Sequence, residues 1–244
     1  MMVLLKRLGL VLVLALSPAL TAHADASDTR AVMVPESGTY SRTVSTQSPE
    51  AQKFFDQGLR LAWGFYFPES IASYQQASLF DPEHPMPYWG IAHAAGPNPN
   101  SRYAQMPDDP QGAGLAAIQS ALARIDRATP MEAELIRALH IFYDADRIPD
   151  PKARDQAYLA QMRALNAKFP DDPDIAALYA GSFMSIRRWD YWDKSGVAKG
   201  ETLAVAQALE HVINTGDPHP GVYHLHIHLI EASLEPERAM VSAN

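Results

Sequence analysis

The sequence predicts an all-α protein built from stacked helix pairs, and three observations carry this prediction. From Pro49 onward, apolar residues recur at helical spacing in alanine-rich runs. Proline, glycine and aspartate interrupt these runs at intervals that suit helix ends. No stretch shows the convincing alternation of a half-buried strand. We therefore expect antiparallel helix pairs to follow one another along most of the chain.

The composition is that of a soluble globular protein. The chain has 244 residues, of which 47% are hydrophobic and 20% are charged. It carries 20 Lys and Arg against 28 Asp and Glu, a formal net charge of -8. This acidic balance argues against nucleic acid and against an anionic membrane surface as partners. The sequence has no cysteine, so neither a disulfide nor a lipidated cysteine is possible.

Residues 1–24 have the three parts of a secretory signal peptide. These parts are the basic pair Lys6-Arg7, the apolar run Leu8–Leu16 and the cleavage site Ala22-His23-Ala24. An uncleaved membrane anchor is the alternative, but the apolar run is short for a bilayer span. We expect a mature chain from Asp25 with 18 basic and 28 acidic residues, a net charge of -10. The prediction is a periplasmic or secreted protein, with no stable membrane insertion after cleavage.

The rest of the chain divides into an extended lead-in, residues 25–48, and a helical domain, residues 49–244. The lead-in is rich in Ser, Thr and Val without a clear period. Near the end of the domain, Glu235–Ala239 repeats the Pro-Glu opening of an earlier helix, so we expect a truncated repeat, with either further repeats in a longer protein or a partner covering the exposed end. The later predicted helices are Leu115–Thr129, Met131–Asp144, Arg154–Phe169, Asp174–Ile186, Thr202–Ile213 and Pro220–Ser233.

One helix pair has a recognisable repeat pattern. Its small residues let two helices approach closely, and its aromatic residues fill the space between them. A closing proline ends the second helix, and a new first helix follows one repeat length on. These positions are Phe54, Gly58 and Leu61, then Pro68-Glu69-Ser70, then Tyr74, Ala77 and Pro82, followed by Tyr88, Ile91, Ala92 and Ala95. The spacing resembles the tetratricopeptide repeat (TPR), which has a period of about 34 residues.

Nearly all of the mature chain also resembles a family of exported bacterial TPR proteins. The residues that carry this resemblance are Phe54–Leu59, Tyr88–Ala92 with Gly96–Asn100, Trp189–Trp192, and His219–Gly221 leading into Ile227–Ser233. The resemblance implies a TPR-like α-solenoid, export from the cytoplasm and further repeats beyond this chain. It implies no particular activity.

Two regions are candidates for binding a partner. The long insertion after the third predicted helix carries Asn98, Asn100 and Arg102, whose side chains can hydrogen-bond a peptide backbone or carboxylate. Trp189 and Trp192 form an aromatic cluster before a glycine-containing turn. The alternatives are that Pro and Asn merely shape a connection, and that the aromatic residues belong to the core.

A histidine-rich segment is a candidate metal site. On a helix beginning near Pro220, His224 and His228 share one face, and Glu231 lies one turn further. Such a pair can hold Zn²⁺ or Cu²⁺ if another ligand comes from elsewhere, and His93 is a distant candidate. The alternative is that these histidines only hydrogen-bond within the helix stack.

Two further histidines of this segment are expected to stay apart from the pair. His226 lies about 200° around the helix from His224. His219 precedes the helix, where its side chain can cap the N-terminus or bend back.

No catalytic motif was found that would define an enzyme. The chain has no cysteine, no Gly-x-Ser-x-Gly elbow, no Walker pattern and no His-Glu-x-x-His motif. The sequence thus favours an exported TPR scaffold that binds a protein or peptide, and it leans away from an enzyme without deciding the matter. The alternative is a metal-binding protein or metalloenzyme with its site around residues 220–233.

Overall fold

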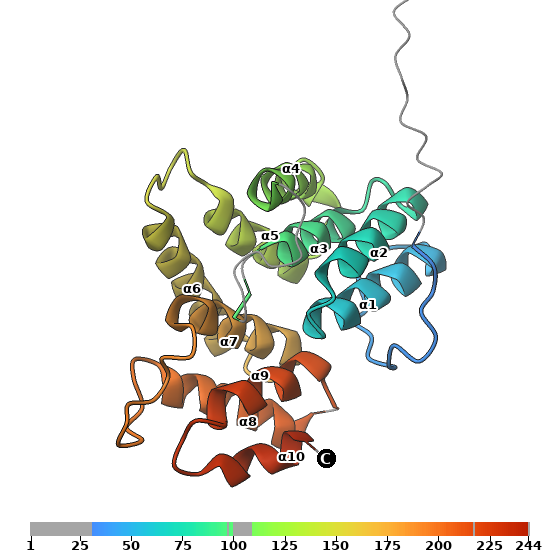
Figure 1. Cartoon of the computed structure of the whole chain (residues 1–244). Coiled ribbons are helices and arrows are strands. Elements are labelled where there is room, and N and C mark those ends of the chain that lie inside the picture. The colour runs from blue at the N-terminus through green and yellow to red at the C-terminus, as the bar shows by residue number, and fades with distance from the viewer. Residues whose placement is uncertain (1–30, 97, 100–108, 217, 244) are drawn as a thin grey trace, which may run out of the picture.

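The computed structural model describes residues 31–96, 98–99, 109–216 and 218–243. This part of the chain is all-helical and contains no strand, which confirms the all-α part of the predicted fold class. The predicted signal peptide, Asn100 and Arg102 lie outside the described residues. The α-helices are α1 (Pro49–Trp63), α2 (Phe67–Phe80), α3 (Pro85–Ala95), α4 (Pro110–Leu122), α5 (Pro130–Tyr143), α6 (Pro151–Lys168), α7 (Pro173–Arg187), α8 (Thr202–Thr215), α9 (Pro220–Ile230) and α10 (Met240–Ala243) (Figure 1).

Most of these helices begin in the same way, with a capping side chain followed by proline. Proline suits the first helical position because its fixed φ matches the helix and its missing N–H needs no partner there. The preceding side chain accepts a hydrogen bond from a backbone N–H of the first turn. The capping residues are Ser48, His84, Asp109, Thr129, Asp150, Asp172 and His219, at α1, α3, α4, α5, α6, α7 and α9.

Two of the predicted helices differ clearly in their bounds from the observed ones. The helix predicted over Leu115–Thr129 begins at Pro110, because Asp109 caps it, and ends at Leu122 before a short 3₁₀ turn. The helix predicted over Pro220–Ser233 ends at Ile230. After it, Pro236–Ala239 form a 3₁₀ turn that leads into α10.

Consecutive helices pack against one another from α1 to α9 (Figure 1). Two glycines approach the buried ring of Tyr74 on α2 closely. A Cβ built on Gly58 would lie 2.8 Å from this ring, and one on Gly90 would lie 2.4 Å from it. The predicted role of Gly58, to let α1 approach α2, is therefore confirmed.

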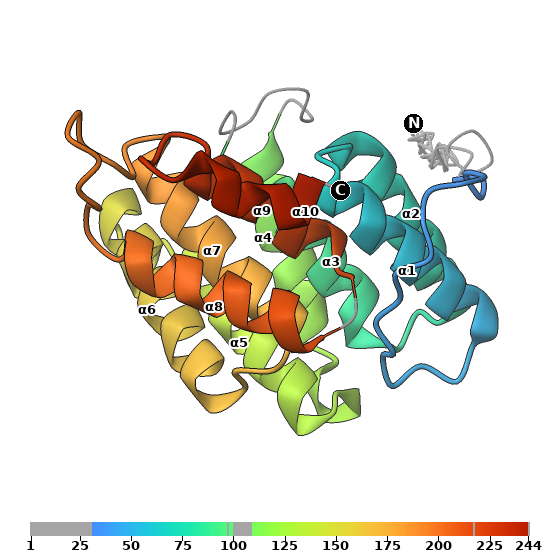
Figure 2. The same ribbon diagram turned by 90° about the horizontal axis from the view of Figure 1, so that it is seen from below.

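The last long helix also meets the first. Helix α9 packs on α7 and α8, as Figures 1 and 2 show, and it contacts α1 as well. A Cβ on Gly221 of α9 would lie 2.4 Å from the ring of Trp63, so only glycine allows this approach. No helix in the described part of the chain is long and apolar enough to cross a membrane.

The end of the lead-in is tied to this junction by a buried carboxylate. The side chain of Asp174, on α7, accepts hydrogen bonds from the Tyr40 hydroxyl and the Arg42 guanidinium, both at 2.7 Å. Its other oxygen lies 3.0 Å from His219 Nε2. Burial alone raises the pKa of Asp174, but the bond from His219 and the charge of Arg42 outweigh it and hold the pKa well below its usual range. Asp174 is thus a buried anion that joins the lead-in, α7 and α9.

We predict that Asp174→Asn lowers the free energy of unfolding by about 3 kcal/mol, because it leaves the charge of Arg42 partly uncompensated in a buried place. Denaturant unfolding at pH 7 measures this loss. The control is Asp171→Asn, whose carboxylate is 82% exposed and whose replacement should change stability by less than about 0.5 kcal/mol. Equal losses in the two variants would contradict the structural role of Asp174.

We further predict opposite effects for two glycine-to-alanine changes in helices. A Cβ on Gly181 of α7 would have its closest contact at 3.9 Å, so Gly181→Ala should stabilise the protein by about 0.5–1 kcal/mol through helix propensity. Gly90→Ala should destabilise it, because the new methyl group overlaps the ring of Tyr74. Thermal unfolding of both variants checks the pair, and a stabilising Gly90→Ala would show that α3 can move away from α2.

Candidate functional site

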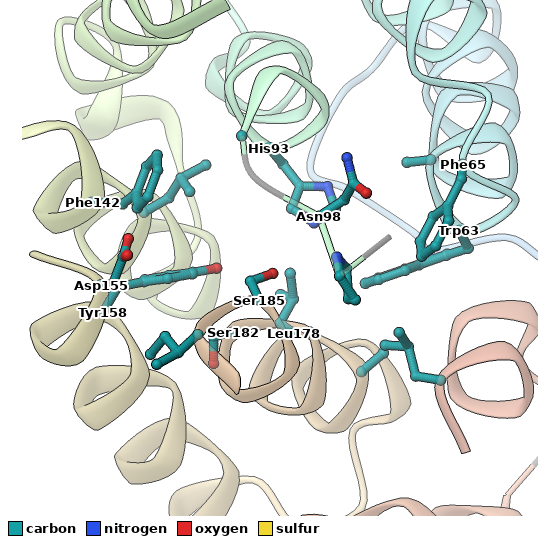
Figure 3. A pocket seen from close by; sticks show the side chains of 18 of the residues that line it. Trp63, Phe65, His93, Asn98, Phe142, Asp155, Tyr158, Leu178, Ser182 and Ser185 are labelled. Atoms are coloured by element: carbon teal, nitrogen blue, oxygen red, sulfur yellow. The ribbon is translucent and has the colours of Figure 1, made fainter. Parts of the chain in front are cut away.

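The helix stack forms a partly open pocket with a cavity volume of about 70 Å³. Helices α1, α2, α3, α5, α6, α7 and α9 all contribute to its walls (Figure 3). Most of the lining is apolar, as is usual for ligand pockets in proteins. The apolar lining residues are Ala62, Trp63, Phe65, Phe67, Leu139, Phe142, Ala177, Leu178, Ile186 and Leu225.

A few polar side chains enter this apolar wall from α6 and α7. Asp155 and Tyr158 are one turn apart on α6, and Ser182 and Ser185 are one turn apart on α7, so each pair shares a helix face. Figure 3 shows the Tyr158 hydroxyl directed into the pocket. Burial raises the pKa of Tyr158, which keeps its hydroxyl protonated. The hydroxyl of Ser182 already donates to the backbone oxygen of Tyr179.

On the opposite side of the pocket, His93 lies between two indole rings. Its ring is parallel to that of Trp89, with centroids 5.2 Å apart, and meets Trp63 edge-on at 5.3 Å. Burial lowers the pKa of His93 to about 4, so the imidazole is neutral at pH 7. Its buried Nδ1 and the indole Nε1 atoms of Trp63 and Trp89 have no hydrogen-bond partner among the described residues. Unpaired buried polar atoms are rare in proteins, and they are suited to a polar group of a ligand.

We predict that the neutral state of His93 makes stability depend on pH. The pKa is about 4 in the folded state and about 6.5 in the unfolded state, so the unfolded chain binds more protons between these values. His93 therefore lowers stability as the pH falls from 6.5 to 4. In His93→Phe this contribution is absent. As the pH falls from 6.5 to 4, the unfolding free energy of the wild type should therefore decrease by roughly 3 kcal/mol more than that of the variant. Urea unfolding at several pH values measures it, and a constant difference would contradict a buried neutral His93.

Of the five predicted partner-binding residues, the structure places one in this pocket. Asn98 is buried and lines the wall, while Asn100 and Arg102 lie outside the described residues. The indole of Trp192 donates to the backbone oxygen of Leu229 at 2.7 Å, which fixes it against α9. Trp189 is 42% exposed and does not line the pocket.

The predicted metal-binding residues, by contrast, are neighbours in space. The Nε2 atoms of His224 and His228 lie 3.0 Å apart. The Nδ1 atom of His224 is 2.6 Å from the backbone oxygen of Trp63, and that of His228 is 3.2 Å from a carboxylate oxygen of Glu231. Trp189 packs its ring edge-on against His228, with centroids 4.9 Å apart. We call His224 and His228 the histidine pair.

Other histidines have separate roles. His219 caps α9 through Nδ1, which accepts a hydrogen bond from Val222, and so fills the capping role considered for it. His226 is buried and lies near Ser242 and Glu210, away from the pair, as its helical position predicts. Within the described residues, no group of three or more His, Asp or Glu side chains is arranged to hold a metal ion.

Sequence reasoning missed most of the pocket. The polar pairs Asp155/Tyr158 and Ser182/Ser185 stand at ordinary helical spacing, which also suits a solvated or hydrogen-bonded face. Their meeting depends on how α6 and α7 pack, and local pattern does not specify this. The one available signal was a pair of serines on α7, a helix whose residues are otherwise mostly apolar.

Comparison with protein-family models, curated proteins and solved structures gives no significant match for this chain. The fold and the geometry of the two sites are therefore the basis for any statement about function.

Proposed function

We propose that this chain is an exported TPR-type α-solenoid that binds a peptide segment of a partner protein, with an apolar side chain of the peptide in the pocket. The observation that carries the proposal is the pocket itself, a largely apolar space with few polar groups, built from seven helices of the stack. Burial of an apolar side chain there would supply affinity, and the polar groups would select its orientation.

The order of the helices supports a TPR-type solenoid. Each helix packs on the next one along the chain, and α1 and α2 meet through Gly58 and Tyr74 at the positions that the repeat pattern requires. In such repeats, side chains from successive helix pairs line a shared binding surface. The lining helices include α1, α3, α5, α7 and α9, which are the first helices of the successive pairs.

The polar groups of the pocket favour a peptide over a purely apolar ligand. A peptide offers an N–H and a C=O beside each apolar side chain. The unpartnered Nδ1 of His93 and the hydroxyl of Tyr158 lie on opposite sides of the pocket, each beside an aromatic ring, so a peptide in the pocket can contact both polar and apolar groups.

We predict that the chain binds short peptides that carry a central Phe, Trp or Leu, and binds matched peptides with Lys or Glu at that position at least tenfold more weakly. Isothermal titration calorimetry with synthetic 12-residue peptides measures this preference. Gly181→Phe places a ring in the pocket and should abolish binding. The control Leu203→Phe changes an exposed position on α8 and should leave binding intact.

Two results would contradict the proposal. One is the absence of any preference for apolar peptides, and the other is full binding by a folded Gly181→Phe variant. A third measurement separates peptide from small-molecule recognition: N-acetyl-phenylalaninamide should bind more weakly than the phenylalanine peptide, and equal affinity would indicate a small aromatic molecule instead.

A further inference from the structure

The hydrogen bonds around the histidine pair determine which nitrogens carry protons. The backbone oxygen of Trp63 can only accept, so Nδ1 of His224 donates to it. The carboxylate of Glu231 is likewise an acceptor, so Nδ1 of His228 donates to it. In the neutral imidazoles, each Nε2 then carries a lone pair, and the two Nε2 atoms lie 3.0 Å apart.

Two nitrogen lone pairs at this distance repel each other unless a positive charge lies close to both nitrogens. An additional proton or a metal cation can supply that charge. The anchoring of both Nδ1 atoms by a carbonyl and a carboxylate is the arrangement that orients metal-ligating histidines, because it directs each Nε2 at the ion. We propose that the Nε2 atoms of His224 and His228 form a binding site for Cu²⁺.

The separation of the two nitrogens favours copper over zinc. For a metal at the usual 2.0–2.1 Å from both nitrogens, the nitrogen–metal–nitrogen angle would be roughly 90–97°. This angle suits adjacent positions of a tetragonal ion such as Cu²⁺ and is narrower than the tetrahedral angle of Zn²⁺. Imidazole sites also bind Cu²⁺ more tightly than the other divalent ions of this series. Two protein ligands leave the other positions to water or to a donor of a partner.

The aromatic walls of the site are held by unusual backbone conformations. Phe65 lies 4.3 Å from the ring of His224, and Trp189 lies 4.9 Å from that of His228, as ring-centroid distances. Both aromatic residues have positive φ, 63° and 69°, which is uncommon for residues with a large side chain. Such strain persists only where surrounding structure enforces it, and it concentrates at functional sites. The strained residues flank the histidine pair on two sides.

The test is a titration of the untagged protein with Cu²⁺ at pH 7.5, in competition with a chromophoric chelator. We expect one Cu²⁺ per chain, with an electron paramagnetic resonance spectrum that shows two imidazole nitrogens. His228→Ala should weaken binding at least tenfold. It is the main variant because His228 is partly exposed, whereas His224→Ala also removes the bond to Trp63. Glu231→Ala should weaken binding about tenfold by freeing the ring of His228.

The matched control is His211→Ala, which removes an exposed histidine from α8 that pairs with Asp171. It should bind Cu²⁺ as the wild type does. If His228→Ala and wild type bind Cu²⁺ equally, the pair holds only a proton and the proposal fails. Tighter binding of Zn²⁺ than of Cu²⁺ in the same assay would overturn the assignment of the metal.

Discussion

The buried carboxylate of Asp174 is the interaction on which the arrangement of the helices depends. It lies where α7, α9 and the lead-in meet, and its three partners Tyr40, Arg42 and His219 come from two of these segments. A buried charge is costly unless it is fully paired, so α9 and the lead-in must both be in place before Asp174 is stabilised. The carboxylate thus favours one arrangement of these segments over other arrangements that would bury the apolar residues equally well.

This junction also positions both candidate sites. His219 bonds to Asp174 through one nitrogen and caps α9 through the other, so the start of α9 is fixed to α7. The ring of His219 contacts Trp63, which forms part of the pocket wall. The backbone oxygen of Trp63 in turn accepts from His224. The pocket and the histidine pair are therefore built on the same contact between α1 and α9.

Local features of the sequence predicted the helices and part of each site. Gly58 and Tyr74 could be assigned to a helix crossing because their spacing matches the repeat pattern. His224 and His228 could be predicted to be neighbours because i,i+4 residues share one face of a helix. The Asp174 cluster could not be predicted in this way. Tyr40 and Asp174 are 134 positions apart, and nothing in either neighbourhood specifies the other. The pocket escaped prediction for the same reason, since seven helices contribute to its wall.

The two proposed sites share one wall residue. Phe65 lines the pocket and also contacts the ring of His224, and Leu225 lines the pocket from the next position on α9. In the proposed binding modes, a peptide side chain in the pocket would contact Phe65, and an ion held by the histidine pair would fix the ring of His224, against which Phe65 packs. If occupation of one site displaces the ring of Phe65, it changes the free energy of binding at the other site, and by linkage the effect is reciprocal.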